Sequence, residues 1–142
     1  MPTDFETTVE WNGGYPAKLS CQNGLSADYS YPVEFGGLKG YITPEDAFVS
    51  AANMCYQIIF SGIAKSLGID LAGYRCRAVG KLDTIDGIRK FVSIDLHPEI
   101  RLRKPVEPER LQKALDATKR KCLVTNSMDL EIRVFPMTVE GA

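Results

Sequence analysis

The sequence predicts an α+β fold in which antiparallel strands and two main helices follow the order βββ-α-ββ-α-β. Two regions, residues 5–35 and 74–102, alternate apolar with polar side chains, which is the period of strands that bury one face. Two other segments, 43–67 and 107–122, carry the start signals and the apolar spacing of helices. A short alternating run at 130–134 adds a last strand.

The length and charge of the chain limit its class. Its 142 residues suit one domain, 1–142, that can bury about 68–70% of the unfolded surface. Seventeen Lys and Arg against eighteen Asp and Glu give a net charge of −1, without the basic run of a nucleic-acid-binding surface. No signal peptide is evident, and Lys65 and Asp70 follow the apolar run 58–63 too closely for a membrane span of about 20 residues. We therefore expect a soluble cytoplasmic protein that binds neither nucleic acid nor membrane.

The cysteine usage points away from structural disulfides. In a reducing compartment the four cysteines are expected to be free, catalytic or metal-binding. A zinc site has little to be built from, because there is no Cys-x-x-Cys pair and the only histidine is His97. No metal and no cofactor is expected.

Three antiparallel strands are expected in the first third of the chain. Apolar and polar residues alternate at 5–11, 17–22 and 29–35. Asn12-Gly13-Gly14 supplies turn residues after the first run, and Asn23-Gly24 after the second is a strong hairpin signal.

The first helix combines clear end signals with an unusual apolar surface. Thr43 suits the N-cap, Pro44 the first helical position and Glu45 the first turn, while Gly68 suits the C-terminal end. The expected buried stripe comprises Phe48, Ala51, Ala52, Cys55, Ile59, Gly62, Ile63 and Ser66. The other faces are also apolar, and such a helix is buried on most sides. A single small sheet cannot cover it, so we expect a homodimer.

A second sheet and a second helix are expected in the remainder. Residues 74–82 and 92–102 form strands around an Asp86-Gly87 hairpin turn, and Pro98 within the second of them suggests an edge or a bulge. The second helix starts near Glu107-Pro108. Its apolar stripe consists of Leu111, Leu115, Thr118 and Cys122.

Two cysteines are the strongest candidates for chemistry. Cys55 and Cys122 each fall on the apolar stripe of a helix, so packing of the two helices could bring the sulfurs together. The alternative for Cys55 is a small apolar filler, because free cysteine is among the most buried residue types. A working Cys55 thiolate needs a nearby cation or hydrogen-bond donor, since apolar burial raises the pKa of a thiol. Cys122 lies at a helix C-terminus, which disfavours a thiolate and suits a resolving thiol.

The remaining candidates have simpler explanations. Glu45 suits the helix dipole, and ten residues of helix place it about 15 Å from Cys55 along the axis. If both serve one site, Glu45 comes from the neighbouring subunit. Cys21 and Cys76 align with the apolar faces of strands and are expected in the core. His97 lies on a polar strand face and is expected in solvent.

The chain resembles the OsmC/Ohr family of osmotically induced and organic-hydroperoxide-resistance proteins. The resemblance is carried by residues 43–55 with Gly68-Ile69 after them, by Lys121–Thr125, and by the element order from about Phe5 to Val139. It implies an intertwined homodimer with two active sites at the subunit interface. It also implies a thiol peroxidase acting on organic hydroperoxides, in which Cys55 is the peroxidatic thiol, Cys122 the resolving thiol and Glu45 the acidic residue of the site.

One feature of the resembling family is missing. Its peroxidases hold the thiolate with an N-terminal arginine, whereas no arginine precedes Arg75 here and Glu34 occupies the corresponding place. Lys18 or Lys39 could supply charge, but an ammonium is not equivalent to a bidentate guanidinium.

The resemblance leads to one main functional hypothesis and two alternatives. The main one is a peroxidase that forms a Cys55–Cys122 disulfide and is recycled by an external dithiol reductant. An apolar lining from Phe48, Met54, Tyr56, Ile58 and Phe60 would favour organic hydroperoxides. The first alternative is a protein of the same fold that binds an apolar small molecule or senses redox state. The second is a purely structural dimer module.

Overall fold

The computed structural model describes residues 2–140, which divide into two compact units on either side of residue 48. The first unit contains a small sheet and the start of the long helix α1 (Pro44–Ser66). The second contains the rest of α1 and everything after it. A single domain of 1–142 stays a prediction.

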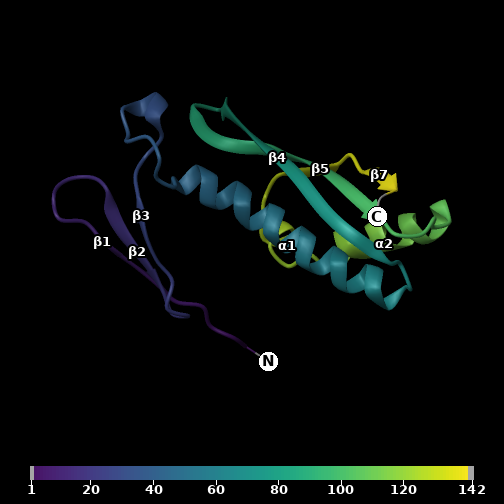
Figure 1. Cartoon of the computed structure of the whole chain (residues 1–142). Helices are drawn as coiled ribbons and strands as arrows, with labels where there is room; N and C mark the ends of the chain where they lie inside the picture. Colours follow the sequence, from purple (N-terminus) through teal and green to yellow (C-terminus); the bar gives the residue numbers. More distant parts are fainter. Residues whose placement is uncertain (1, 141–142) are drawn as a thin grey trace. The chain divides into compact units, whose positions relative to one another are not determined.

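The first unit contains a three-stranded antiparallel sheet in the order β1-β2-β3 (Figure 1). The strands are β1 (Thr7–Glu10), β2 (Ala17–Cys21) and β3 (Ser26–Tyr29), which confirms the first two predicted strands. The third prediction, 29–35, is wrong because β3 ends at Tyr29 and a 3₁₀ turn, η1 (Val33–Phe35), follows.

The turn around η1 has physical causes that alternation does not reveal. Pro32 has no N–H to donate to a strand ladder, and its carbonyl accepts from both Phe35 and Gly37 instead. A Cβ atom at Gly37 would lie 1.7 Å from the Tyr31 carbonyl oxygen, so only glycine allows this close approach. The aromatic residues of this segment therefore belong to a turn.

Helix α1 begins and ends where the sequence predicts. The Asp46 N–H donates to the Thr43 hydroxyl at 3.0 Å, and the Asp46 carboxylate accepts from the Thr43 N–H at 3.2 Å, which is a reciprocal capping box. At the other end Gly68 has a φ of +72°, and the Ile69 N–H donates to the Ala64 carbonyl at 2.9 Å. This is the left-handed glycine termination.

The second unit is built on a long antiparallel hairpin of β4 (Leu71–Ile85) and β5 (Ile88–Leu102). Asp86 and Gly87 both have positive φ, as a two-residue hairpin turn of type I′ requires, and the predicted hairpin is confirmed. Two short strands, β6 (Glu131–Val134) and β7 (Met137–Glu140), pair with β5 in parallel.

The parallel pairing corrects the purely antiparallel expectation, and the chain ends in two strands rather than one. Helix α2 (Pro108–Lys121) explains why β6 runs parallel to β5, because it carries the chain back along β5 before β6 starts. The predicted helix from Glu107-Pro108 to Cys122 is confirmed, with Glu107 as N-cap and Cys122 as C-cap. The fold class is α+β with one antiparallel and one mixed sheet.

Pro98 lies neither on an edge strand nor at a bulge, so that prediction is wrong. It is buried in β5, which pairs with β4 on one side and with β6 and β7 on the other. The pairing with β6 stops at Leu96, and the pairing with β7 starts at Glu99. Pro98 falls in the gap between the two, where no partner needs its missing N–H.

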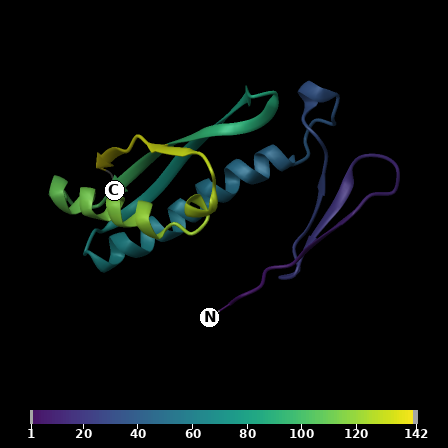
Figure 2. The same cartoon turned by 180° about the vertical axis from the view of Figure 1, so that it is seen from behind.

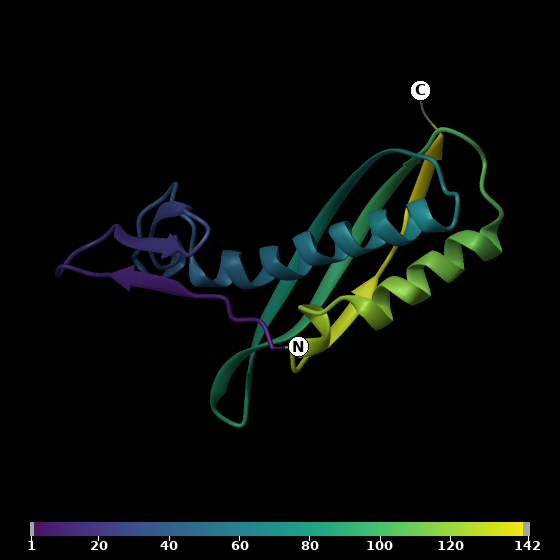
Figure 3. The same ribbon diagram turned by 90° about the horizontal axis from the view of Figure 1, so that it is seen from below.

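Within the second unit, α1 and α2 lie on the same side of the β4–β5 hairpin (Figures 2 and 3). The buried residues of α1 recur every four positions and are Ala52, Tyr56, Phe60 and Ala64. The ring of Phe60 packs 5.8 Å from that of Tyr74 on β4. The buried face of α1 is therefore centred about one residue away from the predicted stripe through Cys55 and Ile59. Because the helix is apolar on several sides, its sequence does not reveal which face packs in the core.

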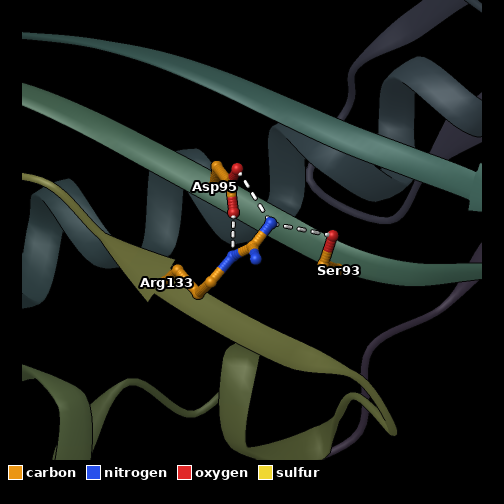
Figure 4. Close-up of polar contacts among 3 residues, drawn as sticks. All are labelled: Ser93, Asp95 and Arg133. Atoms are coloured by element: carbon orange, nitrogen blue, oxygen red, sulfur yellow. Dashed lines mark hydrogen bonds and ion pairs between the residues drawn. The ribbon is translucent and has the colours of Figure 1, made fainter.

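An ion pair ties β6 to the centre of the sheet (Figure 4). Arg133 lies directly opposite Asp95 in the parallel register and donates to both of its carboxylate oxygens, one at 3.0 Å. The Arg133 guanidinium also donates to the Ser93 hydroxyl, over a longer distance of 3.5 Å. Both charged side chains are partly exposed, so we assign the pair about 0–1 kcal/mol of stability and a role in fixing the register.

By length and composition alone, α1 could cross a membrane, which the sequence argument from Lys65 and Asp70 did not anticipate. The core helix of a soluble protein passes the same test. In the second unit α1 has the contacts of a core helix, because Phe60 is fully buried and the Asn53 side chain donates to the Cys76 carbonyl of β4 at 3.2 Å.

Candidate active site

The structure brings the Cys55 and Cys122 thiols within interaction distance of each other in the second unit. Cys55 is half-buried in the middle of α1, whereas Cys122 is fully buried at the C-cap of α2. Both thiols are free. Cys55 is therefore the more exposed of the two cysteines.

The surroundings of Cys55 act on its acidity in opposite directions. Burial raises the pKa of the Cys55 thiol most, and the neighbouring Cys122 thiol raises it further. Backbone hydrogen bonding at Val124 and at Leu123 lowers this pKa and opposes the rise. The net pKa is raised, so only a small fraction of this thiol is ionised at neutral pH.

No cation contributes to the acidity of Cys55 among the residues that the structure describes, 2–140. This agrees with the absence of an arginine before Arg75 in the sequence. Among residues 2–140, the groups that lower the pKa of Cys55 are backbone hydrogen-bonding groups at Val124 and Leu123.

Glu45 is not among the groups that act on the Cys55 thiol of its own chain. It lies in the first turn of α1, ten positions before Cys55. Its Oε1 atom is buried and has no hydrogen-bond partner within residues 2–140. A buried carboxylate oxygen is costly to leave unpaired.

The other two cysteines are not among the groups that set the pKa of Cys55. Cys76 is half-buried on β4, and burial raises the pKa of its thiol. Arg75 and Arg77 are exposed, as their alternation with Cys76 predicts. Cys21 is half-buried on β2 in the first unit. Neither cysteine is as deeply buried as a core residue.

The expectation of a solvated His97 is wrong in part. Its ring stacks on that of Phe135, with the ring centres 5.2 Å apart, and the residue is half-buried. The chain segment between β6 and β7 carries Phe135 over this face, which strand alternation in β5 alone cannot show.

Sequence reasoning placed Tyr56 in a substrate lining, but the structure buries it beside the thiol pair, and its pKa is raised by burial and then by the nearby Cys76, Cys122 and Asp116. Two features near the pair were missed: the backbone hydrogen bonding at Leu123 and Val124, and the Asn126 side chain, which caps the end of α2. The burial of Tyr56 could have been predicted only by knowing which face of α1 packs in the core. The backbone groups carry no sequence signal because almost every residue has them.

Metal ligands do not gather in the described part of the chain. No group of three or more His, Cys, Asp or Glu side chains lies close enough to hold an ion among residues 2–140. The thiol pair is therefore the centre from which chemistry can be argued.

Comparison with known proteins relates this arrangement to one family. The family model of OsmC-like proteins matches residues 36–135. No curated protein sequence matches the chain. Solved structures are similar in fold at low identity. An OsmC-like protein of unknown function from Vibrio cholerae has a TM-score of 0.88 at 19% identity, with 96% of this chain and 100% of that chain covered.

Two further structures show the same fold. An OsmC-like protein from Mycoplasma pneumoniae has a TM-score of 0.82 at 20% identity, covering 98% of this chain and 99% of its own. An organic hydroperoxide resistance protein from Elizabethkingia anophelis has a TM-score of 0.77 at 22% identity, with 99% of each chain covered. At these identities the likeness establishes the fold, and the chemistry has to be argued from the residues.

Proposed function

Because the chain belongs to the OsmC-like protein family, we propose that it is a thiol-dependent peroxidase that reduces organic hydroperoxides through Cys55 and Cys122. The observation that carries the proposal is the pairing of a half-buried cysteine with a fully buried one. The similarity to organic hydroperoxide resistance proteins supports the substrate class.

In the first step the Cys55 thiolate attacks the distal oxygen of the hydroperoxide. The O–O bond breaks, the alkoxide takes a proton and leaves as an alcohol, and Cys55 becomes a sulfenic acid. The half-buried position of Cys55 supports this role, and backbone hydrogen bonding at Val124 and Leu123 favours the anionic form of the thiol.

In the second step the Cys122 thiol attacks the sulfenic sulfur of Cys55, which releases water and forms a disulfide. An external dithiol then reduces this disulfide by two thiol exchanges and is itself oxidised. Such a cycle suits the cytoplasm, where thiols are kept reduced, and this is the compartment we propose.

The substrate preference rests on apolar side chains around Cys55. Met54 and Ile58 are 60% and 63% exposed on α1, on either side of Cys55 in the sequence. Tyr56 and Phe60, which the sequence also placed in the lining, are buried in the core of the second unit and are not available to a substrate. An alkyl or aryl hydroperoxide would gain apolar contacts that hydrogen peroxide cannot make.

We propose that the functional form is a homodimer. The exposed apolar residues Met54 and Ile58 on a long apolar helix support it, as does an apolar hollow of about 320 Å³ in the first unit between the sheet and the start of α1. In this dimer Glu45 serves the Cys55 site of the neighbouring subunit, as the resemblance to the family implies.

The dimer should be stable at micromolar concentration and sensitive to charge on α1. Ile58→Glu is expected to give a monomer by light scattering, because it places a carboxylate in an apolar interface. Ile88→Glu is the matched control, since Ile88 is equally exposed at 65% but lies at the β4–β5 hairpin. A well-folded wild-type monomer at micromolar concentration would overturn both the dimer and the role of Glu45.

Mild oxidation should link Cys55 to Cys122 within one chain. One equivalent of an alkyl hydroperoxide is expected to give this disulfide as the main product, because the Cys122 thiol lies beside the Cys55 sulfur. Peptide mapping after alkylation of free thiols identifies the bridge. A main bridge that involves Cys21 or Cys76 would contradict the assignment of the site.

A second candidate function is a small-molecule-binding or redox-sensing protein of the same fold. The raised pKa of Cys55 and the absence of a cation beside it favour this alternative. The rate at which Cys55 reacts with an alkyl hydroperoxide near neutral pH separates the two. A rate no higher than that of a free thiol favours the binding protein, and two unreactive thiols would indicate a structural module.

A further inference from the structure

A hollow of about 370 Å³ lies on the face of the second unit's sheet that points away from α1 and α2 (Figures 2 and 3). The ring of Phe60 on α1 packs against that of Tyr74 on β4, so the residues next to Tyr74 along the strand point to the opposite face. The lining residues on that opposite face include Arg75, Arg77, His97, Glu99, Phe135 and Met137. The volume is that of a small-molecule site, and neither thiol of the candidate active site lines it.

The charges that line this hollow favour an anion. Neither the Arg75 nor the Arg77 guanidinium has a hydrogen bond or an ion pair within residues 2–140. Across the strands Arg77 is opposite His97, and Arg75 is opposite Glu99. The next carboxylate on this face of β5, Asp95, is already held in the ion pair of Figure 4. With His97 neutral, two positive charges and one negative charge line the hollow, which suits a ligand that carries a single negative charge.

The spacing of the two arginines suits a carboxylate. Arg75 and Arg77 are two residues apart on β4, so their Cα atoms are about 6.6 Å apart and their side chains leave the same face. A guanidinium binds a planar carboxylate through two parallel N–H···O bonds. Two long side chains at this spacing can converge on one carboxylate group.

The other side of the hollow is apolar and aromatic. It is formed by the chain that pairs with β5 on the side opposite β4. The rings of His97 and Phe135 stack, with their centres 5.2 Å apart and their planes 17° from parallel. Phe135 and Met137 are 49% and 54% exposed, so both present apolar surface that a ligand can cover. An aromatic ring gains most here, because it packs favourably against another ring.

We propose that this hollow binds a small aromatic carboxylate. The carboxylate group lies between the Arg75 and Arg77 guanidiniums, and the aromatic body lies against Phe135 and Met137. This site is separate from the thiol pair, and it does not depend on the proposed peroxidase function.

The probe for this site is 2-naphthoate, which joins one carboxylate to an aromatic body. Titration of the isotope-labelled full chain near neutral pH, followed by amide chemical shifts, is expected to show saturable binding with a Kd of about 0.1–1 mM. The largest shifts are expected at the lining residues of β4 and β5. Absence of saturable binding, or shifts centred on Cys55, would overturn the proposal.

Arg77→Ala is expected to weaken 2-naphthoate binding about tenfold, because it removes a hydrogen-bonding partner that carries the opposite charge. Arg101→Ala is the matched control. Arg101 is exposed and lies on the same face of β5 as Glu99, but its side chain lies over Gly73 and does not line the hollow. The control is expected to change the Kd less than twofold. Equal weakening in both variants would show a general effect of net charge and overturn the site.

Two further variants test the charge balance and the aromatic wall, and the amide spectrum of each checks its fold. Glu99→Gln is expected to tighten 2-naphthoate binding about threefold or more, because it removes the like charge from the hollow. Phe135→Leu is expected to weaken 2-naphthoate about fivefold and to leave the weaker binding of cyclohexanecarboxylate within twofold, because only the aromatic ligand loses a ring partner. Unchanged 2-naphthoate binding in Glu99→Gln, or tighter wild-type binding of 2-naphthyl phosphate than of 2-naphthoate, would contradict a site for a singly charged carboxylate.

Discussion

Cys55→Ser is expected to abolish reduction of organic hydroperoxides, with a loss of about 10³-fold or more. A serine hydroxyl is not ionised near neutral pH and does not form the sulfenic acid on which the cycle depends. The measurement is consumption of an alkyl hydroperoxide in the presence of a dithiol reductant. Cys122→Ser should behave differently, because Cys55 can still react once. It is expected to consume one equivalent of hydroperoxide in a burst and then to stop.

The other cysteines supply the controls for this experiment. Cys21→Ser and Cys76→Ser should keep wild-type turnover, because Cys21 lies on β2 in the first unit and Cys76 is not among the groups that act on Cys55. Full activity in Cys55→Ser, or loss of activity in Cys76→Ser alone, would move the reacting thiol to another position. Circular dichroism of each variant checks that the fold is intact.

The fold could be predicted where the signals were local. Three local signals each depend on only a few adjacent residues, and all three are confirmed: the helix start at Thr43, the Asp86-Gly87 turn and the glycine end of α1. The errors concern features that depend on distant segments. The parallel direction of β6 and the place of Pro98 follow from how the chain returns to β5 after α2, which no local pattern records.

The candidate site shows the same division. Periodicity could suggest that Cys55 and Cys122 face each other, and the structure places the two thiols together. It could not show that Cys55 lies at the border of the buried stripe rather than in it, since the rings of Tyr56 and Phe60 take the central positions. That border position is what leaves Cys55 half-buried. The hydrogen bonding at Val124 and Leu123 was invisible for a different reason, because it involves backbone groups.

The absence of an arginine before Arg75 leads to the second prediction with a large effect, which concerns the pH dependence of the Cys55 reaction. The pKa of Cys55 is raised by burial, and the thiolate is the reactive form, so the rate constant of the wild-type protein with an alkyl hydroperoxide should increase as the pH rises toward that pKa. Below it the thiol is protonated and the rate falls about tenfold per pH unit. A cation near the sulfur would shift this profile to lower pH, because it favours the charged form.

If the new side chain reaches the Cys55 site, Glu34→Arg is expected to lower the pKa of Cys55 by about 1–2 units and to raise peroxide reduction at pH 7 by about tenfold or more. Glu34 is exposed in η1 and falls where the resembling family carries its arginine, so the change removes a negative charge and adds a bidentate cation. Glu34→Gln separates the two effects, and Glu10→Arg, on exposed β1, controls for net charge. The pH profile of Cys55 alkylation gives the pKa, and hydroperoxide consumption gives the rate. A wild-type thiol already ionised well below neutral pH, and unchanged in Glu34→Arg, would mean that another cation acts there, with Lys18 and Lys39 the first to replace.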